Sequence, residues 1–231
     1  MKKKKIVTFG EIMLRLTTPD NLRIQQSHDF LVSYGGSEAN VAISIANFGG
    51  DVDYITRLPD NALGETCLSE LRSHNIGTQN VLIGGKRLGT YYMEKAAAMR
   101  NSKVIYDREG SAFSELKPDM IDWKEVFKDA DIFHWSGIDA ALTPGLADVC
   151  HEAIAVAKEM GLQVSYDINY RKNLWNYGKS AQEVLRPLSQ ESDIMFGSEG
   201  EYAMLTGIPA PGFKATKNGE AYDLKAYEEF C

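Results

Sequence analysis

Short apolar strands alternate with amphipathic helices along most of this 231-residue sequence. Runs rich in β-branched and aromatic residues predict strands, and apolar residues at three- and four-residue spacing predict helices. The expected strands are residues 4–9, 52–56, 132–135, 162–167 and 193–196, and the expected helices are 38–48, 63–73, 144–160, 181–188 and 199–205. This alternation predicts an α/β fold, with a Rossmann-like parallel sheet flanked by helices on both faces.

Two segments interrupt the alternation with strands that no helix separates. Residues 12–16 form one such strand, and residues 88–106 form a hairpin that turns across 96–101. Ligands of open α/β sheets bind at the carboxyl ends of the parallel strands, so we expect a small β-sheet lid over those ends. Residues 210–221 are polar and indicate a loop, before a short helix at 222–230.

The composition indicates a globular protein with a real core, since 44% of its residues are hydrophobic. No apolar run approaches the ~20 residues that span a bilayer, and the run after Lys5 is too short for a signal peptide. We therefore expect a cytoplasmic protein without a membrane partner. A net charge of −7 argues against a nucleic-acid partner. Cys67, Cys150 and Cys231 are scattered and form no zinc-binding pattern.

A glycine pair leads into the first predicted helix. Gly35 and Gly36 allow positive φ angles and the close approach of a ligand. Ser37 is the expected N-cap, and Asn40 is the expected third helical residue. The free N–H groups of that first turn would face an acceptor-rich or anionic ligand. The alternative is an ordinary strand-to-helix turn, which a glycine pair by itself also indicates.

Five segments together resemble the ribokinase-like (PfkB) carbohydrate kinases, and within that family the 2-keto-3-deoxygluconate kinases. They are residues 9–16 (FGEIMLRL), 35–40 (GGSEAN), 106–112 (YDREGSA), 134–138 (HWSGI) and 167–171 (DINYR). The pairing of Tyr-x-Arg with Asp-x-Asn-x-Arg makes the match specific. The resemblance implies a Rossmann-like domain with a β lid, ATP and Mg²⁺ as cofactors, and phosphorylation of a sugar acid, with 2-keto-3-deoxygluconate converted to its 6-phosphate.

The resemblance also implies which residues contact the sugar acid. They are Gly35, Gly36, Asn40, Tyr91, Tyr106, Arg108 and Arg171, the last of which would also contact the nucleotide phosphates. The residue types agree with this on independent grounds, because arginine binds carboxylates and phosphates through two parallel hydrogen bonds. Tyr106 and Arg108 are two apart on a strand and project from one face. Strand parity favours Tyr91 over Tyr92. The plainer alternative for both arginines is a solvated surface charge.

The sequence departs from the family pattern in two places. Ser198 stands where many members have Asn, and Glu201 stands at the family's Glu. The resemblance gives Ser198 a nucleotide contact and Glu201 a water-mediated Mg²⁺ contact, although Glu201 equally fits a surface helix charge. The Gly-Ala-Gly-Asp segment that carries the family's catalytic base has no match in these residues. No catalytic residue is therefore assigned, and Asp167 is the one nearby stand-in.

On this resemblance, residues 1–231 form the N-terminal part of a ribokinase-like kinase domain, with the C-terminal nucleotide-binding part absent. The lid strands are expected at about 12–17, 28–34 and 88–107, and a homodimer is expected through them. Two alternatives stay open: another PfkB sugar kinase such as a fructokinase, and a non-catalytic sugar-acid-binding fragment. A nicotinamide-dependent enzyme is disfavoured because no G-x-G-x-x-G follows the first strand.

Overall fold

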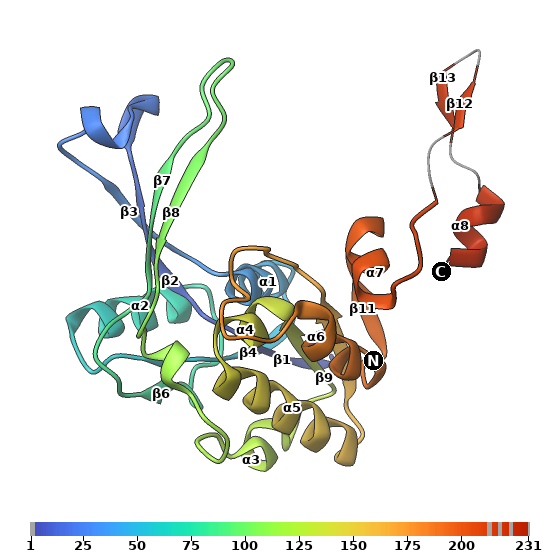
Figure 1. Cartoon of the computed structure of the whole chain (residues 1–231). Helices are drawn as coiled ribbons and strands as arrows, with labels where there is room; N and C mark the ends of the chain where they lie inside the picture. Colours follow the sequence, from blue (N-terminus) through green and yellow to red (C-terminus); the bar gives the residue numbers. More distant parts are fainter. Residues whose placement is uncertain (1–2, 212–213, 217–218, 222–223, 231) are drawn as a thin grey trace.

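The computed structural model describes residues 3–211, 214–216, 219–221 and 224–230. A parallel sheet of five strands in the order β11-β10-β9-β1-β4 occupies the centre of the molecule (Figure 1). The strands are β1 (Lys5–Phe9), β4 (Asp51–Ile55), β9 (Ile132–Ser136), β10 (Gln163–Asp167) and β11 (Ile194–Phe196). The predicted α/β fold is confirmed.

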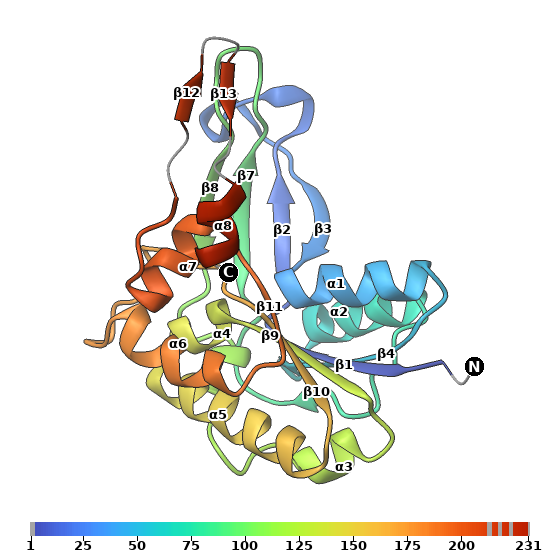
Figure 2. The same cartoon turned by 90° about the vertical axis from the view of Figure 1, so that its right-hand side faces the viewer.

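Helices lie on both faces of this sheet (Figure 2), and the edge strand β11 stays exposed. On one face lie α1 (Ser37–Asn47) and α2 (Ala62–Ser73). On the other face lie α3 (Trp123–Phe127), α4 (Gly137–Leu142), α5 (Pro144–Glu159) and α6 (Ala181–Gln190). Beyond β11 the chain continues through α7 (Glu199–Thr206) to α8 (Leu224–Phe230). None of the helices in the described ranges is long and apolar enough to cross a membrane.

Alternating side chains of the strands build a separate core on each face. The larger core joins the sheet to α5 and includes the stacked rings of Trp135 and Tyr166, whose centroids are 4.4 Å apart. The smaller core packs Tyr54 of β4 against α1 and α2. Cys67 and Cys150 are buried, one in each core, as small apolar groups. The two cores fix the carboxyl edge of the sheet, where polar segments then meet.

A second sheet stands out from that carboxyl edge (Figures 1 and 2). Its strands are β2 (Met13–Thr17), β3 (Leu31–Gly35), β7 (Thr90–Glu94) and β8 (Lys103–Asp107), in the order β3-β2-β7-β8, and we call it the lid sheet. β7 and β8 form the predicted antiparallel hairpin, whereas β2 and β7 run parallel. The cross-strand register places Arg15, Tyr91 and Tyr106 in one row on one face.

Several short elements were not predicted because they are too short to show periodicity. They are α3, α4, the strand pair β5 (Arg57–Leu58) and β6 (Leu82–Ile83), and three 3₁₀ turns at Pro19–Asn21, Ile24–Gln26 and Phe113–Glu115. The loop predicted for residues 210–221 is wrong in part, since β12 (Lys214–Thr216) and β13 (Gly219–Ala221) pair antiparallel there. Residues 222–223 of the predicted last helix, and Cys231, lie outside the described residues.

Candidate functional site

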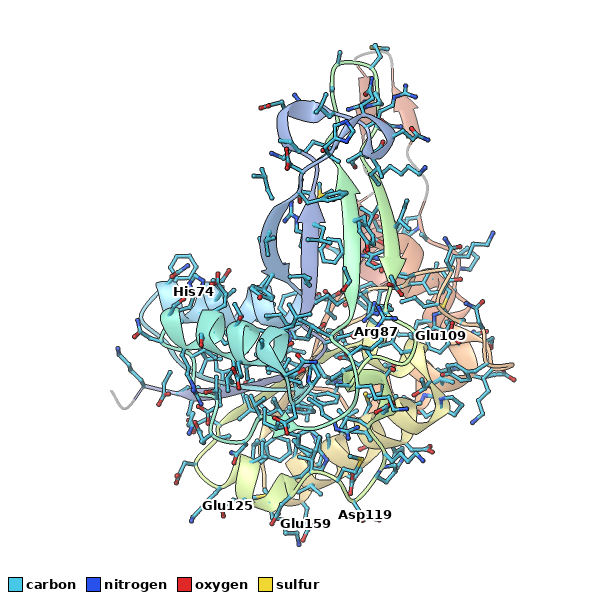
Figure 3. The ribbon with its side chains drawn as sticks, turned by 90° about the vertical axis from the view of Figure 1, so that its left-hand side faces the viewer. His74, Arg87, Glu109, Asp119, Glu125 and Glu159 are labelled. Carbon is cyan, nitrogen blue, oxygen red and sulfur yellow. The ribbon has the colours of Figure 1, made fainter. Side chains whose placement is uncertain are left out.

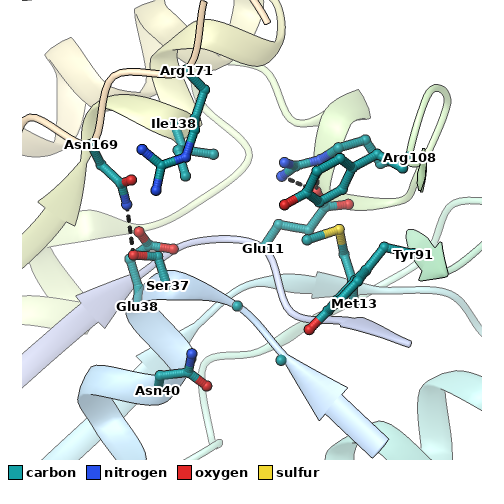
Figure 4. A pocket seen from close by; sticks show the side chains of 13 residues that line it. Glu11, Met13, Ser37, Glu38, Asn40, Tyr91, Arg108, Ile138, Asn169 and Arg171 are labelled. Carbon is teal, nitrogen blue, oxygen red and sulfur yellow. Dashed lines mark hydrogen bonds and ion pairs between the residues drawn. The ribbon is translucent and has the colours of Figure 1, made fainter. Parts of the chain in front are cut away.

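A cavity of about 280 Å³ lies where the lid sheet meets the carboxyl ends of the parallel strands (Figure 4). Its lining includes all seven residues for which the sequence suggested a sugar contact, namely Gly35, Gly36, Asn40, Tyr91, Tyr106, Arg108 and Arg171. Six further residues complete the lining, namely Glu11, Met13, Ser37, Glu38, Ile138 and Asn169. Ser198 and Glu201 do not line it. The fold thus brings segments from residue 11 to residue 171 together at one place.

The glycine pair is required by close packing rather than by unusual backbone angles. The φ of Gly36 is −168°, an extended conformation that any residue adopts, and Gly35 has no positive φ either. A Cβ on Gly36 would lie 2.1 Å from the backbone oxygen of Glu11, and one on Gly35 would lie 2.7 Å from the Tyr91 hydroxyl. The positive φ expected from sequence is therefore not used, and the glycines instead admit two neighbouring cavity residues.

Helix α1 begins one residue earlier than predicted. Gly36 is the N-cap, Ser37 is the first helical residue and Asn40 is the fourth. The Ser37 hydroxyl accepts a hydrogen bond of 2.8 Å from the side-chain amide of Asn169 and makes no capping bond. The predicted N-cap is wrong because the loop after β10 takes up that hydroxyl. Asn40 stays exposed at the edge of the cavity.

Two tyrosines of the lid sheet form one wall of the cavity. Tyr91 and Tyr106 are direct cross-strand partners, with ring centroids 5.7 Å apart. Burial raises the pKa of Tyr91, so its hydroxyl is protonated and able to donate at neutral pH. The Cζ atom of Arg108 lies 5.9 Å from the Tyr106 ring centroid, within the range of a cation–π contact. Parity places Tyr91 on the cavity side, as the sequence predicted.

Arg108 is held by the carboxylate of Glu11, which was not among the predicted site residues. Its Nε donates to Oε2 of Glu11 at 2.7 Å, and its Nη2 contacts the same oxygen. The side chains of Glu11 and Arg108 are only 3% and 11% exposed. A charge-assisted pair of this kind is strong and directional. Arg108 therefore enters the cavity as one half of an ion pair and not as an isolated cation.

Arg171 follows β10 on a loop shaped by its neighbours. Asn169 has a φ of 42°, a left-handed angle that Asn tolerates, and its backbone N–H donates to Oδ1 of Asp167 at 3.2 Å. The Arg171 guanidinium points into the cavity opposite Arg108 and donates to the Tyr170 carbonyl at 3.0 Å (Figure 4). It forms no ion pair with any residue in the described ranges, although its charge acts to lower the pKa of both Asp167 and Glu201.

Two buried carboxyl groups lie behind the cavity. Glu38, in the first turn of α1, is 1% exposed, and Asp139 of α4 is 0% exposed. Burial raises the pKa of Glu38 to about 7, although a hydrogen bond with Ser136 opposes the shift. Burial and the nearby Glu38 charge also raise the pKa of Asp139. One oxygen of each carboxyl has no hydrogen-bond partner among the described residues. Together the two groups retain a proton near neutral pH.

Glu11 and Glu38, which line the cavity, and Asp139, which is buried next to Glu38, are the acidic residues that the sequence did not predict. Glu11 follows the first buried strand, a position where α/β sheets present ligand contacts, so its place along the chain was a usable signal. Glu38 and Asp139 lie in first helical turns, where acidic side chains are common because they complement the helix dipole. Nothing in their spacing distinguishes a buried acid from a solvated one.

Ser198 and Glu201 form a capping box at the start of α7. The N–H and hydroxyl of Ser198 donate to Oε2 of Glu201 at 2.8 and 2.9 Å, and the N–H of Tyr170 donates to Oε1 at 2.7 Å. Burial works to raise the pKa of Glu201, but these hydrogen bonds outweigh it and lower the pKa. Within the described ranges, no group of three or more His, Cys, Asp or Glu residues could hold a metal ion.

Comparison with known proteins agrees with this architecture. The profile of the pfkB family carbohydrate kinases matches residues 3–228. A 2-dehydro-3-deoxygalactonokinase of Haloferax volcanii is 33% identical over 195 residues, which cover 84% of this chain and 61% of that protein. The chain therefore spans about three fifths of that relative's length.

Two crystal structures extend the comparison. A 2-dehydro-3-deoxygluconokinase of Thermotoga maritima is 40% identical, with a TM-score of 0.89 over 98% of this chain and 68% of that one. A fructokinase of Xylella fastidiosa with bound ATP shares the fold at 23% identity, with a TM-score of 0.77 over 89% of this chain and 61% of that one. The resemblance drawn from the sequence motifs is confirmed, and the chain belongs to the pfkB family of carbohydrate kinases.

Proposed function

We propose that this chain binds a 2-keto-3-deoxy sugar acid in the cavity beneath the lid sheet and positions it for phosphorylation by ATP. The observation that carries the proposal is the pair of guanidinium groups, Arg108 and Arg171, that line one cavity from opposite sides (Figure 4). Relatives at 33% and 40% identity are named as kinases of two such acids, the 2-dehydro-3-deoxygalactonate and 2-dehydro-3-deoxygluconate types.

Charge balance supports a carboxylate-bearing substrate. Glu11 neutralises Arg108, and burial raises the pKa of Glu38 to about 7, so Arg171 is the cavity cation that forms no ion pair with a described residue. Arginine matches the planar geometry of a carboxylate, and a fixed cation is needed to attract an anion to a protein of net charge −7.

Substrate positioning is the chemistry we assign to this part of the protein. Phosphoryl transfer depends mainly on holding the acceptor hydroxyl in line with the phosphate and on stabilising charge. The hydroxyls of Tyr91 and Tyr106 and the amide of Asn40 are suited to fix the sugar hydroxyls. Asp167 does not line the cavity and is bonded to the backbone of Asn169, which favours a role in shaping the strand end over a role as general base.

ATP and Mg²⁺ belong to the same proposal. We place the nucleotide phosphates beside Arg171 and Ser198, near the start of α7. Mg²⁺ supplies charge neutralisation to the phosphates. Both oxygens of Glu201 already accept protein hydrogen bonds, so the described residues do not fit a direct metal cage, and Glu201 would contact the ion through water. We also place the protein in the cytoplasm, where ATP is available and buried thiols stay reduced.

Isothermal titration calorimetry with 2-keto-3-deoxygluconate tests the proposal. The unmodified chain should bind the acid, and Arg171→Gln should weaken binding by about tenfold or more, since a charged hydrogen bond is lost. Arg171→Lys should recover part of the loss because it restores the charge without the two-donor edge. Arg186→Gln, on the exposed face of α6, is the matched control. Preferential binding of fructose would overturn the acid assignment in favour of a fructokinase.

We also propose that the lid sheet pairs two copies of the chain. Its two outer strands, β3 and β8, have unpaired edges, and Leu31, Val32, Val104 and Ile105 on them are 40–63% exposed. An edge strand with exposed apolar side chains is a ready surface for self-association. A C₂ dimer would cover this surface in both subunits at once.

A further inference from the structure

Two glycines approach Glu11 closely, one at its carboxylate and one at its backbone oxygen. A Cβ on Gly89 would lie 2.4 Å from Oε1 of Glu11, and a Cβ on Gly36 would lie 2.1 Å from its backbone oxygen. The segment before β7 and the turn before α1 therefore approach Glu11 at distances that only a glycine at each position allows. The close approach of Gly89 to Oε1 leaves the carboxylate little freedom to move, and the approach of Gly36 fixes the backbone that carries it.

Arg108 is in turn held from two directions by the chain. Glu11 accepts from Nε and contacts Nη2, both through the single oxygen Oε2, while the Tyr106 ring lies 5.9 Å away. The remaining Nη1 group makes no hydrogen bond to a residue in the described ranges, and the Arg108 side chain lines the cavity (Figure 4). A guanidinium has a second donor edge made of its two terminal nitrogens, and that edge suits a carboxylate.

We propose that Glu11 is a positioning residue that fixes the orientation of Arg108, so that its outer donor edge is preset for the carboxylate of the substrate. The inference rests on the proposed sugar-acid function and adds the residue that sets specificity for the acid. A preset guanidinium loses less conformational freedom on binding, which strengthens and sharpens recognition. Glu11 touches no substrate in this scheme and acts only through Arg108.

A competing role for Glu11 predicts the opposite change in affinity for the acid. If its negative charge merely neutralised Arg108, removing that charge would free the guanidinium and tighten binding of an anion. If instead it positions Arg108, removing it lets the arginine move and weakens binding of the acid. The sign of the change therefore separates the two roles.

Calorimetric titration of 2-keto-3-deoxygluconate into Glu11→Gln decides between them. Positioning predicts that Glu11→Gln binds the acid about tenfold or more weakly. Glu109 is an exposed acid next to Arg108, and the affinity of the control Glu109→Gln should stay within about twofold of that of the unmodified chain. Figure 3 shows Glu109 at the surface near the base of the lid sheet. The double variant Glu11→Gln with Arg108→Gln should bind no worse than Arg108→Gln alone, because both changes remove one interaction. Equal or tighter binding by Glu11→Gln overturns the inference, as do additive losses.

A ligand-free measurement keeps this test independent of the proposed function. Phenylglyoxal modifies accessible arginines, and mass spectrometry reports the rate at Arg108 itself. Glu11→Gln should raise that rate several-fold, whereas Glu109→Gln should leave it unchanged. An unchanged modification rate would refute the restraint of Arg108 by Glu11, whether or not the chain binds a sugar acid. Failure of the chain to bind a sugar acid would refute only the proposed function. If Glu11→Gln does not fold by circular dichroism, Glu11→Asp, which keeps the charge but shortens its reach, should show the same rise in rate.

Discussion

Burial of Glu38 predicts that the protein loses stability as the pH rises from about 4.5 to about 7. Its pKa rises from an ordinary 4.5 to about 7 in the folded chain, mainly because the carboxyl is removed from water. Between these values the folded state binds more protons than the unfolded state, so the free energy of unfolding falls with increasing pH. At about 1.4 kcal/mol per pKa unit, the destabilisation reaches about 3 kcal/mol above pH 7.

Glu38→Gln removes the titration while keeping the shape of the side chain. At pH 5 the variant and the unmodified protein should have similar stability, because both side chains are then uncharged. At pH 8 the variant should be more stable by about 3 kcal/mol, since no charge is left buried. Urea unfolding at pH 5, 6, 7 and 8 and constant ionic strength measures this difference.

Glu65→Gln is the matched control for this change. Glu65 occupies the first turn of α2 as Glu38 occupies that of α1, but it is exposed to solvent. Its substitution should shift the stability by about 0.5 kcal/mol or less at every pH. Parallel curves for the unmodified protein and Glu38→Gln between pH 5 and 8 would show that Glu38 is not the buried titrating group.

Two further predictions concern the turn and the lid sheet. Gly36→Ala should destabilise the protein by about 2 kcal/mol or more in urea unfolding, because its Cβ would meet the Glu11 backbone oxygen at 2.1 Å. Gly200→Ala, in open space on α7, should stabilise the protein by about 0.5–1 kcal/mol. A Gly36→Ala variant more stable than Gly200→Ala would contradict the packing. Ile105→Asp should convert a lid-paired dimer to monomer in sedimentation velocity, whereas Phe48→Asp, 92% exposed outside the lid sheet, should not; an unchanged dimer would rule out this surface.

Sequence alone predicted the parts of the fold that carry a clear period. The five parallel strands and the longer helices are regular enough to be read from apolar spacing, and the hairpin of residues 88–106 stands out because no helix interrupts it. The six-residue helix α4 was missed because it follows β9 without a break and is little more than one turn long. Helix α3 and the short strand pairs escaped prediction for the same reason.

Some residues of the cavity could likewise be predicted from local sequence, whereas others depend on contacts between distant parts of the chain. Arg108 and Arg171 could be chosen because their motifs resemble those of the family and guanidinium groups suit a carboxylate, and the structure places both at one cavity. The partner of Arg108 is 97 residues away, and that contact depends on how β1 and β8 are brought together. The Ser37 cap failed for a related reason, since its hydroxyl is taken by a side chain 132 residues further along.

The position of β1 between β9 and β4 determines the order in which the chain can assemble. β1 pairs with β4 on one side and with β9 on the other, and Lys5 bonds to Asp131, 126 residues away. The first pairing closes a short loop, whereas the second closes a long one and must form later. During synthesis, one edge of β1 therefore stays unpaired after β1, β4 and their helices have formed, until β9 has been synthesised. We expect this half-built sheet, rather than the finished protein, to be the species that aggregates.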